Sequence, residues 1–463
     1  MKFLAILVGK LALLATRLFR FGSGTTLPGL IAEKIDPNII KKLSKNLKFG
    51  TIIVTGTNGK TTTSKMLVEI FSEEGFTVLH NPSGSNLTRG IASALIQSTH
   101  LLRPGLEADI AVFEVDEATM PEATTKLRPT AVLITNLFRD QLDRYGELDK
   151  TAAIIGKSLR GLAKTTVILN ADDPLVSSLS EYAEGEVLYF GVEDSTIKTD
   201  SESAMDSKDC IYCGHELKYE NRYLGHLGKW SCNNCKKKRT EPNFSVKNIS
   251  LSPIKSEFNL SLGTEDAKIE MPIAGLYNIY NALAAASVAS VFEAGLPVIS
   301  HTLRNCSAAF GRMEVIEVDG KKIMMLLVKN PTGANQSVST IYSDGKPKKV
   351  AFILNDNFAD GTDVSWIWDV DFEYFDLHDS YFIASGIRAE DMALRLKYAG
   401  IDTKNCELIK DPVKATKELA KSLKDNEFGY LFPTYTAMVE IRSNFASRED
   451  SLCDIGKVTK HGV

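Results

Sequence analysis

The chain has 463 residues, of which 44% are hydrophobic and 24% charged, and its formal net charge is −4. This length predicts two or three globular domains, and the near balance of charge gives no general reason to expect a nucleic-acid partner. Seven cysteines, four of them in closely spaced pairs, favour a metal site in a reducing compartment over a secreted disulfide framework, so we expect a cytoplasmic protein.

Residues 1–45 are expected to form an N-terminal lead-in, which opens with an apolar segment over residues 3–19. Lys10 and Arg17 interrupt this segment, so its apolar stretches are far shorter than the roughly 20 residues of a membrane-spanning helix. No small-residue cleavage site follows it. The pattern predicts a packed helix, with an interfacial helix that lies on a membrane surface as the alternative.

A phosphate-binding loop is predicted directly after the apolar run at residues 51–54. Residues 55–62 read Thr-Gly-Thr-Asn-Gly-Lys-Thr-Thr, so a strand feeds a glycine loop that opens onto a helix. Backbone N–H groups in such a loop bind nucleotide phosphates, Lys60 can reach the outer phosphates, and the hydroxyl of Thr61 can hold Mg²⁺. Val54 stands where the general motif has glycine, which indicates a shortened variant. The sequence predicts ATP binding; a plain turn between strand and helix is the alternative.

Three more apolar runs, at residues 110–113, 131–135 and 167–169, predict strands of a parallel α/β sheet. Each run ends in polar residues: Glu114, Asn136 and the Asn-Ala-Asp-Asp sequence at 170–173. Ligands of open α/β sheets bind at the carboxyl ends of the strands, so these polar groups should converge near the phosphate loop. Glu114 is the candidate for a second Mg²⁺ contact, and a capping or solvated role is its alternative.

A metal-binding insertion interrupts the sheet pattern at about residues 205–240. Its cysteines form two C-x2-C pairs separated by 18 residues: Cys210 and Cys213, then Cys232 and Cys235. This spacing predicts a zinc ribbon, in which four thiolates complete the coordination sphere and make the site structural. The basic run at residues 236–239 is the only local hint of nucleic acid, and we expect it to be a solvated surface.

The sheet pattern then resumes, and Gly275 opens an Ala-rich helix with Asn278 and Asn281 on one face of its first turns. These amides could read an adenine edge or cap the helix. A new α/β series begins after residues 310–314, with strands expected at 322–328, 350–354 and 381–385. We therefore place a central domain at 46–311 and a C-terminal domain at 312–463.

Taken together, these motifs resemble the Mur ligases in content and order over residues 50–335. The resemblance implies a P-loop central domain followed by a Rossmann-like α/β domain, in an enzyme that converts a carboxylate and ATP into an acyl phosphate for attack by an amine. It implies Mg²⁺ at Thr61 and Glu114, with Lys60 and Glu114 serving catalysis, and a nucleotide site made by Thr57, Asn58, Gly59, Lys60, Thr61, Thr62, Asn278, Asn281, Arg312 and Asn330. Gln141 stands where Mur ligases carry a metal-binding His, which puts the second metal site in doubt.

The four-cysteine insertion and residues 356–369 narrow the resemblance to one branch, the synthetase subunits of lipid II isoglutaminyl synthase. This branch implies ATP-dependent amidation of the D-glutamate α-carboxylate in the lipid II stem peptide, with ammonia from a separate glutaminase subunit, GatD. The sequence supports a missing glutaminase, because Cys306, Cys406 and Cys453 lack the glycine-flanked turn that a cysteine nucleophile of that class needs.

In the same branch, an aspartate of the synthetase subunit completes the partner's Cys-His pair. Asp356 is our candidate because it follows the strand at 350–354, and Asp360 and Asp363 are its rivals. Each could instead be a turn aspartate that bonds its own backbone. Trp366 and Trp368 alternate at strand spacing, so they are either interface anchors or an internal strand face.

A lipid-linked substrate gives the N-terminal helix a role in a weak peripheral contact at the inner face of the cytoplasmic membrane. Two other functions stay open. One is an amino-acid-adding ligase of the folylpolyglutamate type. The other is a catalytically silent ATP-binding scaffold whose ribbon binds nucleic acid or a protein partner.

Overall fold

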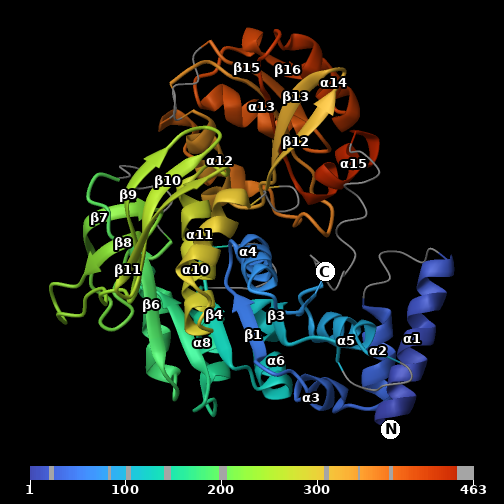
Figure 1. The fold of residues 1–463 in the computed structure, drawn as a ribbon. Coiled ribbons are helices and arrows are strands. Elements are labelled where there is room, and N and C mark those ends of the chain that lie inside the picture. The colour runs from blue at the N-terminus through green and yellow to red at the C-terminus, as the bar shows by residue number, and fades with distance from the viewer. Residues whose placement is uncertain are drawn as a thin grey trace.

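The computed structural model describes residues 1–19, 26–81, 85–100, 106–139, 148–197, 206–306, 312–342, 345–374 and 379–445. This part of the chain is built around two large sheets. The strands of one lie within residues 50–271, and the strands of the other lie within residues 312–433 (Figure 1). The predicted α/β class is confirmed.

Three helices precede the first strand: α1 (Lys2–Phe19), α2 (Leu27–Ile35) and α3 (Ile39–Ser44). One face of α1, which includes Ala5 and Ile6, is buried where the helix packs on α2 and on α5 (Thr88–Gln97). The opposite face is apolar as well but exposed. Among the described residues, no helix combines the length and apolar character that crossing a membrane would need.

The central sheet has nine strands in the order β11-β10-β9-β6-β5-β4-β1-β3-β2. The seven strands from β9 to β2 in this order run parallel to one another, whereas β10 is antiparallel to both β9 and β11. The strands are β1 (Gly50–Thr55), β2 (Val78–His80), β3 (Ile110–Glu114), β4 (Ala131–Ile134), β5 (Thr166–Asn170), β6 (Val187–Val192), β9 (Phe244–Leu251), β10 (Ser256–Leu262) and β11 (Glu265–Met271).

Helices cover both faces of the parallel strands, which explains why those strands read as continuous apolar runs. Ile52 and Val54 of β1 belong to one buried cluster and Ile53 to another, because successive side chains of a strand point to opposite faces. The first cluster includes α4 (Lys60–Glu73), α10 (Leu276–Val291) and α11 (Leu296–Asn305). The second includes α1, α2, α3, α5 (Thr88–Gln97), α6 (Met120–Leu127), α8 (Leu148–Leu159) and α9 (Pro174–Ser178).

The cysteine-bearing insertion lies between β6 and β9, which are themselves neighbours in the sheet. It contains a hairpin of β7 (Lys218–Leu224) and β8 (Leu227–Ser231). A small core of its own surrounds Leu217 and Trp230 together with the cysteines.

The second sheet has six strands in the order β12-β13-β17-β14-β15-β16. It is mixed, because β12 is antiparallel to β13 and the remaining pairs are parallel. Its elements are β12 (Arg312–Val318), β13 (Lys321–Leu326), α12 (Pro331–Ile341), β14 (Lys349–Ile353), β15 (Tyr381–Ser385), α13 (Ala389–Tyr398), β16 (Cys406–Leu408), α14 (Pro412–Ser422), β17 (Gly429–Pro433) and α15 (Tyr435–Phe445).

Two sequence expectations are wrong in detail. Trp366 and Trp368 lie in a single 3-10 turn, Ser365–Asp369, so they do not form a strand face. The basic run at 236–239 is also not uniformly solvated: the side chain of Arg239 is only 7% exposed and pairs with the fully buried Asp172. A local basic pattern cannot reveal a buried carboxylate that lies far away in the sequence, just after β5.

Candidate active site

The phosphate loop joins β1 to α4 through two glycines with left-handed backbone angles. Gly59 has φ +87°, and a Cβ there would lie 2.0 Å from Asn281 Oδ1. Gly56 has φ +121°, and a Cβ there would lie 2.4 Å from Thr135 Oγ1. Asn136 holds the loop, since its Oδ1 accepts from Asn58 N at 2.9 Å. These positions need glycine for both conformation and space.

Lys60 begins α4 and turns back into the loop. Its Nζ donates to Gly56 O at 2.5 Å and lies 3.1 Å from Glu117 Oε1. Burial alone would lower the pKa of Lys60, but the carboxylates of Glu117, Glu114 and Asp116 raise it above its ordinary value. The lysine is therefore a fixed cation. Sequence reasoning gave Glu117 no role, although it stands only three residues after Glu114.

Thr61 and Glu114 bring two oxygen donors together at the carboxyl edge of the sheet. Thr61 Oγ1 donates to Glu114 Oε2 at 2.8 Å. Adjacent ligands of an octahedral Mg²⁺ with bonds of about 2.1 Å are about 3 Å apart, so these donors fit that ion. Asn81, which sequence reasoning missed, fixes the backbone of Glu114 by accepting from its N–H and donating to its carbonyl, both at 2.9 Å.

Thr57 and Thr62 complete the loop. Thr57 Oγ1 donates to Phe138 O at 3.1 Å, which ties the loop to the segment after β4. The hydroxyl of Thr62 is buried and has no hydrogen-bond partner among the described residues. Such a buried polar atom next to the loop is suited to a phosphate oxygen.

A pocket with about 770 Å³ of empty volume opens beside the loop. Its walls come from the phosphate loop, α10, the ribbon hairpin, β12, β13 and α12, and include Asn58, Gly59, Leu224, Leu227, Tyr280, Asn281, Met313, Leu326, Asn330 and Gln336. It therefore lies where the two α/β units meet, beside the phosphate loop.

The three amides that were expected at the nucleotide beside Asn58 occupy different places. Asn281 lines the pocket. Asn278 is buried and donates to Ala274 O at 2.8 Å and does not line the pocket. Asn330 lines it, donates to Asn58 Oδ1 at 3.3 Å and caps α12 by accepting from Gly333 N. The side chain of Arg312 and residue Gln141 lie outside the described part of the chain.

The four ribbon cysteines converge. Their sulfur atoms all lie within 4.8 Å of one another, with 3.6 Å between those of Cys210 and Cys235 and 3.5 Å between those of Cys213 and Cys232. A tetrahedral ion with metal–sulfur bonds of about 2.3 Å requires sulfur separations of about 3.8 Å. The donor set therefore fits a closed metal site, and no position stays open for water.

The three candidate aspartates differ in their surroundings. Both carboxylate oxygens of Asp360 are taken by the backbone N–H and the hydroxyl of Thr436, at 2.7 and 2.5 Å. Asp363 accepts from Ser365 N at 2.8 Å, within its own turn. Asp356 lies just past β14, is partly exposed and pairs with Arg388 at 3.0 Å.

A phosphate loop on β1, a Thr61–Glu114 oxygen pair and a second α/β unit closing the pocket define a Mur ligase. The Mur ligase middle domain model matches residues 54–234 and the MurT ligase C-terminal model matches residues 327–438. The chain is 36% identical to the lipid II isoglutaminyl synthase subunit MurT of Streptococcus pneumoniae over 93% of this chain and 94% of that protein. It is 34% identical to the Staphylococcus aureus MurT subunit, over 94% and 95%.

The chain belongs to the MurT family. Mur ligases use ATP and Mg²⁺. Among solved structures, a pseudomurein peptide ligase type C from Methanothermus fervidus is similar with a TM-score of 0.66 at 22% identity, covering 88% of this chain and 79% of that one. Folylpolyglutamate synthase from Thermotoga maritima shares the fold with a TM-score of 0.57 at 17% identity, covering 89% and 92%.

Proposed function

We propose that this chain is the synthetase subunit of a lipid II isoglutaminyl synthase. It amidates the α-carboxylate of D-glutamate in the stem peptide of lipid II and thereby serves peptidoglycan synthesis. The similarity to two such subunits, over more than nine-tenths of the chain, carries this proposal. The shared location of Lys60, Thr61 and Glu114 supports it, because an ATP-dependent ligase needs its phosphate-binding cation and its Mg²⁺ ligands in one place.

The reaction has two steps. A carboxylate oxygen of the substrate attacks the γ-phosphorus of ATP, the bond to the bridging oxygen breaks, and ADP leaves. Ammonia then attacks the carbonyl carbon of the acyl phosphate, gives up a proton, and phosphate departs with the electrons of the C–O bond. Lys60 and the N–H groups of the loop would bind the phosphates, and Thr61 and Glu114 would hold Mg²⁺. The ion neutralises charge on the phosphates when it is bound.

Zn²⁺ is the ion we assign to the four-cysteine site. Thiolate-only tetrahedral sites select zinc over harder divalent ions such as Mg²⁺. The site has no free coordination position, so its role is to hold the ribbon together.

Ammonia comes from a glutaminase partner of the GatD type. Burial raises the pKa of Cys306 to about 12 and also raises the pKa of Cys406, so neither thiol is a thiolate nucleophile at neutral pH. Cys453 lies outside the described residues. An acyl phosphate hydrolyses where water reaches it, which favours delivery of ammonia from a bound partner.

Asp356 is the residue that we assign to the partner's catalytic Cys-His pair, where a carboxylate would orient the imidazole. Its rivals are engaged in local structure, whereas Asp356 is held at the edge of β14 by Arg388. Two exposed apolar residues are close to this ion pair in sequence. Phe358, two residues after Asp356, is 80% exposed, and Ile387, directly before Arg388, is 55% exposed. Apolar side chains around a held carboxylate suit a protein interface.

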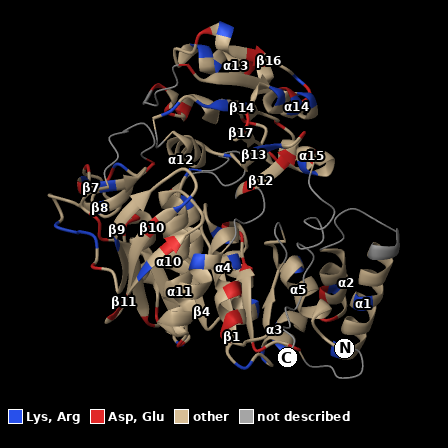
Figure 2. Ribbon diagram, turned by 45° about the horizontal axis from the view of Figure 1, so that its top comes forward, with Lys and Arg blue, Asp and Glu red and all other residues tan. Residues whose placement is uncertain are grey.

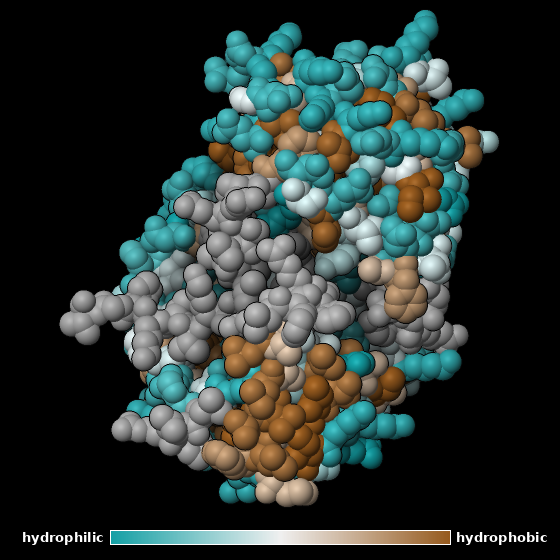
Figure 3. All heavy atoms as spheres, turned by 90° about the vertical axis from the view of Figure 1, so that its right-hand side faces the viewer, coloured by the Kyte–Doolittle hydropathy of each residue, from teal (hydrophilic) through white to brown (hydrophobic). Residues whose placement is uncertain are grey.

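We place the enzyme in the cytoplasm, at the inner face of the membrane that carries lipid II. The exposed face of α1 supports this location. Phe3, Leu4, Leu11 and Leu14 are each more than half exposed on it. Figure 3 shows an apolar patch on this side of the molecule, and α1 is mostly uncharged in Figure 2. The helix carries three cations and no carboxylate, which suits an anionic lipid surface.

The test measures ATP hydrolysis and amidated product with a lipid-linked muramyl pentapeptide. We expect the purified chain to use ammonium salt alone and to use glutamine only together with its glutaminase partner. Lys60→Ala should bind little ATP and make no product. If neither nitrogen source yields product while ATP still binds, the acyl phosphate mechanism is wrong for this chain, and the scaffold function replaces it.

A further inference from the structure

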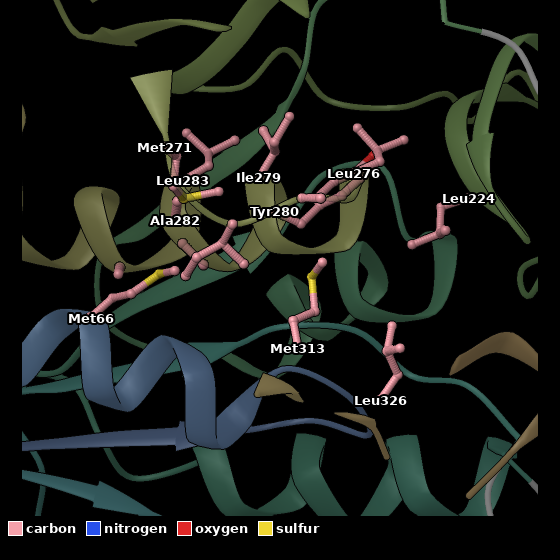
Figure 4. Packing of buried hydrophobic residues seen from close by; sticks show 14 of the residues in the cluster. Met66, Leu224, Met271, Leu276, Ile279, Tyr280, Ala282, Leu283, Met313 and Leu326 are labelled. Carbon is pink, nitrogen blue, oxygen red and sulfur yellow. The ribbon is translucent and has the colours of Figure 1, made fainter. Parts of the chain in front are cut away.

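The ribbon hairpin contributes side chains to the pocket beside the phosphate loop. Leu224 ends β7 and Leu227 begins β8, so both lie at the closed end of the hairpin. They are almost fully buried, and both line the pocket. Figure 4 shows Leu224 with Met313 and Leu326, which belong to the same pocket wall. The cysteine-bearing insertion is therefore part of the wall of this pocket.

The cysteines clamp the other end of the same hairpin. Cys213 precedes β7, and Cys232 directly follows β8. A two-stranded hairpin is marginally stable by itself, so the metal and the small core around Trp230 must supply much of its order. Loss of a bound metal would therefore free both strands at the end opposite the pocket.

Two of the polar contacts that connect the hairpin to the sheet reach neighbouring residues, Ala171 and Asp172. Trp230 Nε1 donates to Ala171 O at 3.0 Å, and Gly228 N donates to Asp172 O at 2.9 Å. The carboxylate of Asp172 accepts from Arg239 Nε at 2.5 Å and from the Tyr280 hydroxyl at 2.7 Å. Tyr280 lines the pocket too. The ribbon and the pocket thus share a buried network.

We propose that the tip of the metal ribbon forms the apolar wall against which the nucleotide base packs, so that metal occupancy sets the affinity for ATP. Asn58 and Gly59 of the phosphate loop line the pocket, and so do Leu224 and Leu227, so phosphates bound at the loop would leave the leucines to contact the base. This inference rests on the proposed function, because it takes the pocket as the ATP site. It assigns the ribbon a role in substrate binding beyond local stability.

Equilibrium binding of Mg·ATP to the full chain tests the pocket wall. We expect Leu224→Ala to weaken binding about five- to tenfold, since it removes most of one buried leucine from the base contact. Leu262→Ala is the matched control, because Leu262 is 6% exposed in the same buried cluster and does not line the pocket. It should leave the dissociation constant within about twofold. Equal weakening in both variants would overturn the assignment.

The metal arm compares the native chain with Cys213→Ser/Cys235→Ser and with chelator-treated protein, and it records metal content, the thermal midpoint and ATP affinity. At temperatures below the thermal midpoint, where the protein is still folded, we expect the metal-depleted protein to bind ATP at least about fivefold more weakly than the native chain. Metal-free protein that is folded and binds ATP normally would refute the coupling. Lys60→Ala distinguishes a failure of the proposed nucleotide site from a failure of this inference. If Lys60→Ala does not weaken ATP binding, the proposed nucleotide site is wrong. If Lys60→Ala weakens ATP binding and Leu224→Ala does not, only the role of the ribbon tip is wrong.

Discussion

Thr61 and Glu114 meet at the carboxyl edge of the central sheet, where Thr61 Oγ1 donates a 2.8 Å hydrogen bond to Glu114 Oε2. The two oxygens are positioned as neighbouring ligands of one ion. We expect Glu114→Gln and Thr61→Val each to raise the Mg²⁺ concentration needed for half-maximal ATP hydrolysis on the order of tenfold. Thr61→Ser keeps the hydroxyl and should stay near the native value. An unchanged Mg²⁺ requirement in Thr61→Val would remove Thr61 from the metal site.

Glu117 Oε1 lies 3.1 Å from Lys60 Nζ, and the side chains of Lys60 and Glu117 are only 11% and 7% exposed. Removal of Glu117 takes away the carboxylate that is hydrogen-bonded to Lys60, and breaking such a largely buried pair typically costs about 3–5 kcal/mol. We therefore expect Glu117→Gln to lower the urea midpoint strongly and Lys60→Met/Glu117→Gln to recover part of the loss. The two single variants and the double variant form a cycle with a coupling of about 1–3 kcal/mol. Strictly additive losses would show that the two residues do not interact.

Asp356 should matter for one nitrogen source only. With the partner subunit present, Asp356→Asn is expected to reduce glutamine-dependent amidation by at least about a hundredfold, because the imidazole loses its orienting carboxylate. Amidation from ammonium salt should persist. Asp363→Asn is the control for a change of charge in the same loop, and we expect native rates from both sources. Equal loss from both sources in Asp356→Asn would assign Asp356 to the synthetase reaction or to folding.

The parts of the fold that follow from sequence are those encoded over short distances. The loop at 55–62 carries its strand, turn and helix within one segment, and β3 and β15 lie within one residue of the expected runs. The cysteine spacing works in the same way, because each C-x2-C pair fixes half of its ligand set locally. These patterns need no knowledge of the rest of the chain.

Contacts made across the chain could not be predicted. Asn81 follows the three-residue strand β2 and reaches Glu114 only because β2 and β3 pair. Leu224 lies in a polar insertion, so its place in the pocket depends on how the ribbon packs on the sheet. Arg239 was expected at the surface because its neighbours are lysines. Its burial depends on Asp172, 67 residues earlier.

Arg239 should therefore differ sharply from Lys238, which is exposed in the same run. We expect Arg239→Leu to destabilise the protein by about 3–5 kcal/mol and Lys238→Leu by less than about 0.5 kcal/mol. Burial raises the pKa of Asp172 even beside Arg239. Without the arginine that pKa rises further, so the folded variant binds a proton that the unfolded chain releases above about pH 4.

The sign of the pH effect follows from that proton. Above about pH 4 the folded Arg239→Leu variant holds more protons than its unfolded chain, so the stability of this variant must fall as the pH rises. The deficit of Arg239→Leu relative to the native protein should accordingly be larger at pH 8 than at pH 5, as measured by urea unfolding at both values. A deficit that is constant with pH would mean that Asp172 does not carry the cost.

The exposed face of α1 makes a prediction about membranes. Leu11→Gln/Leu14→Gln removes two exposed apolar side chains and no packed one, so the fold should be retained. We expect sedimentation with anionic phospholipid vesicles to fall about tenfold or more and the KM for lipid-linked substrate to rise. Rates with a soluble muramyl peptide should not change. Leu394→Gln is the control, since Leu394 is 46% exposed on α13, far along the chain from α1. Vesicle binding that is indifferent to the α1 changes would show that another surface, or a protein partner, covers this helix.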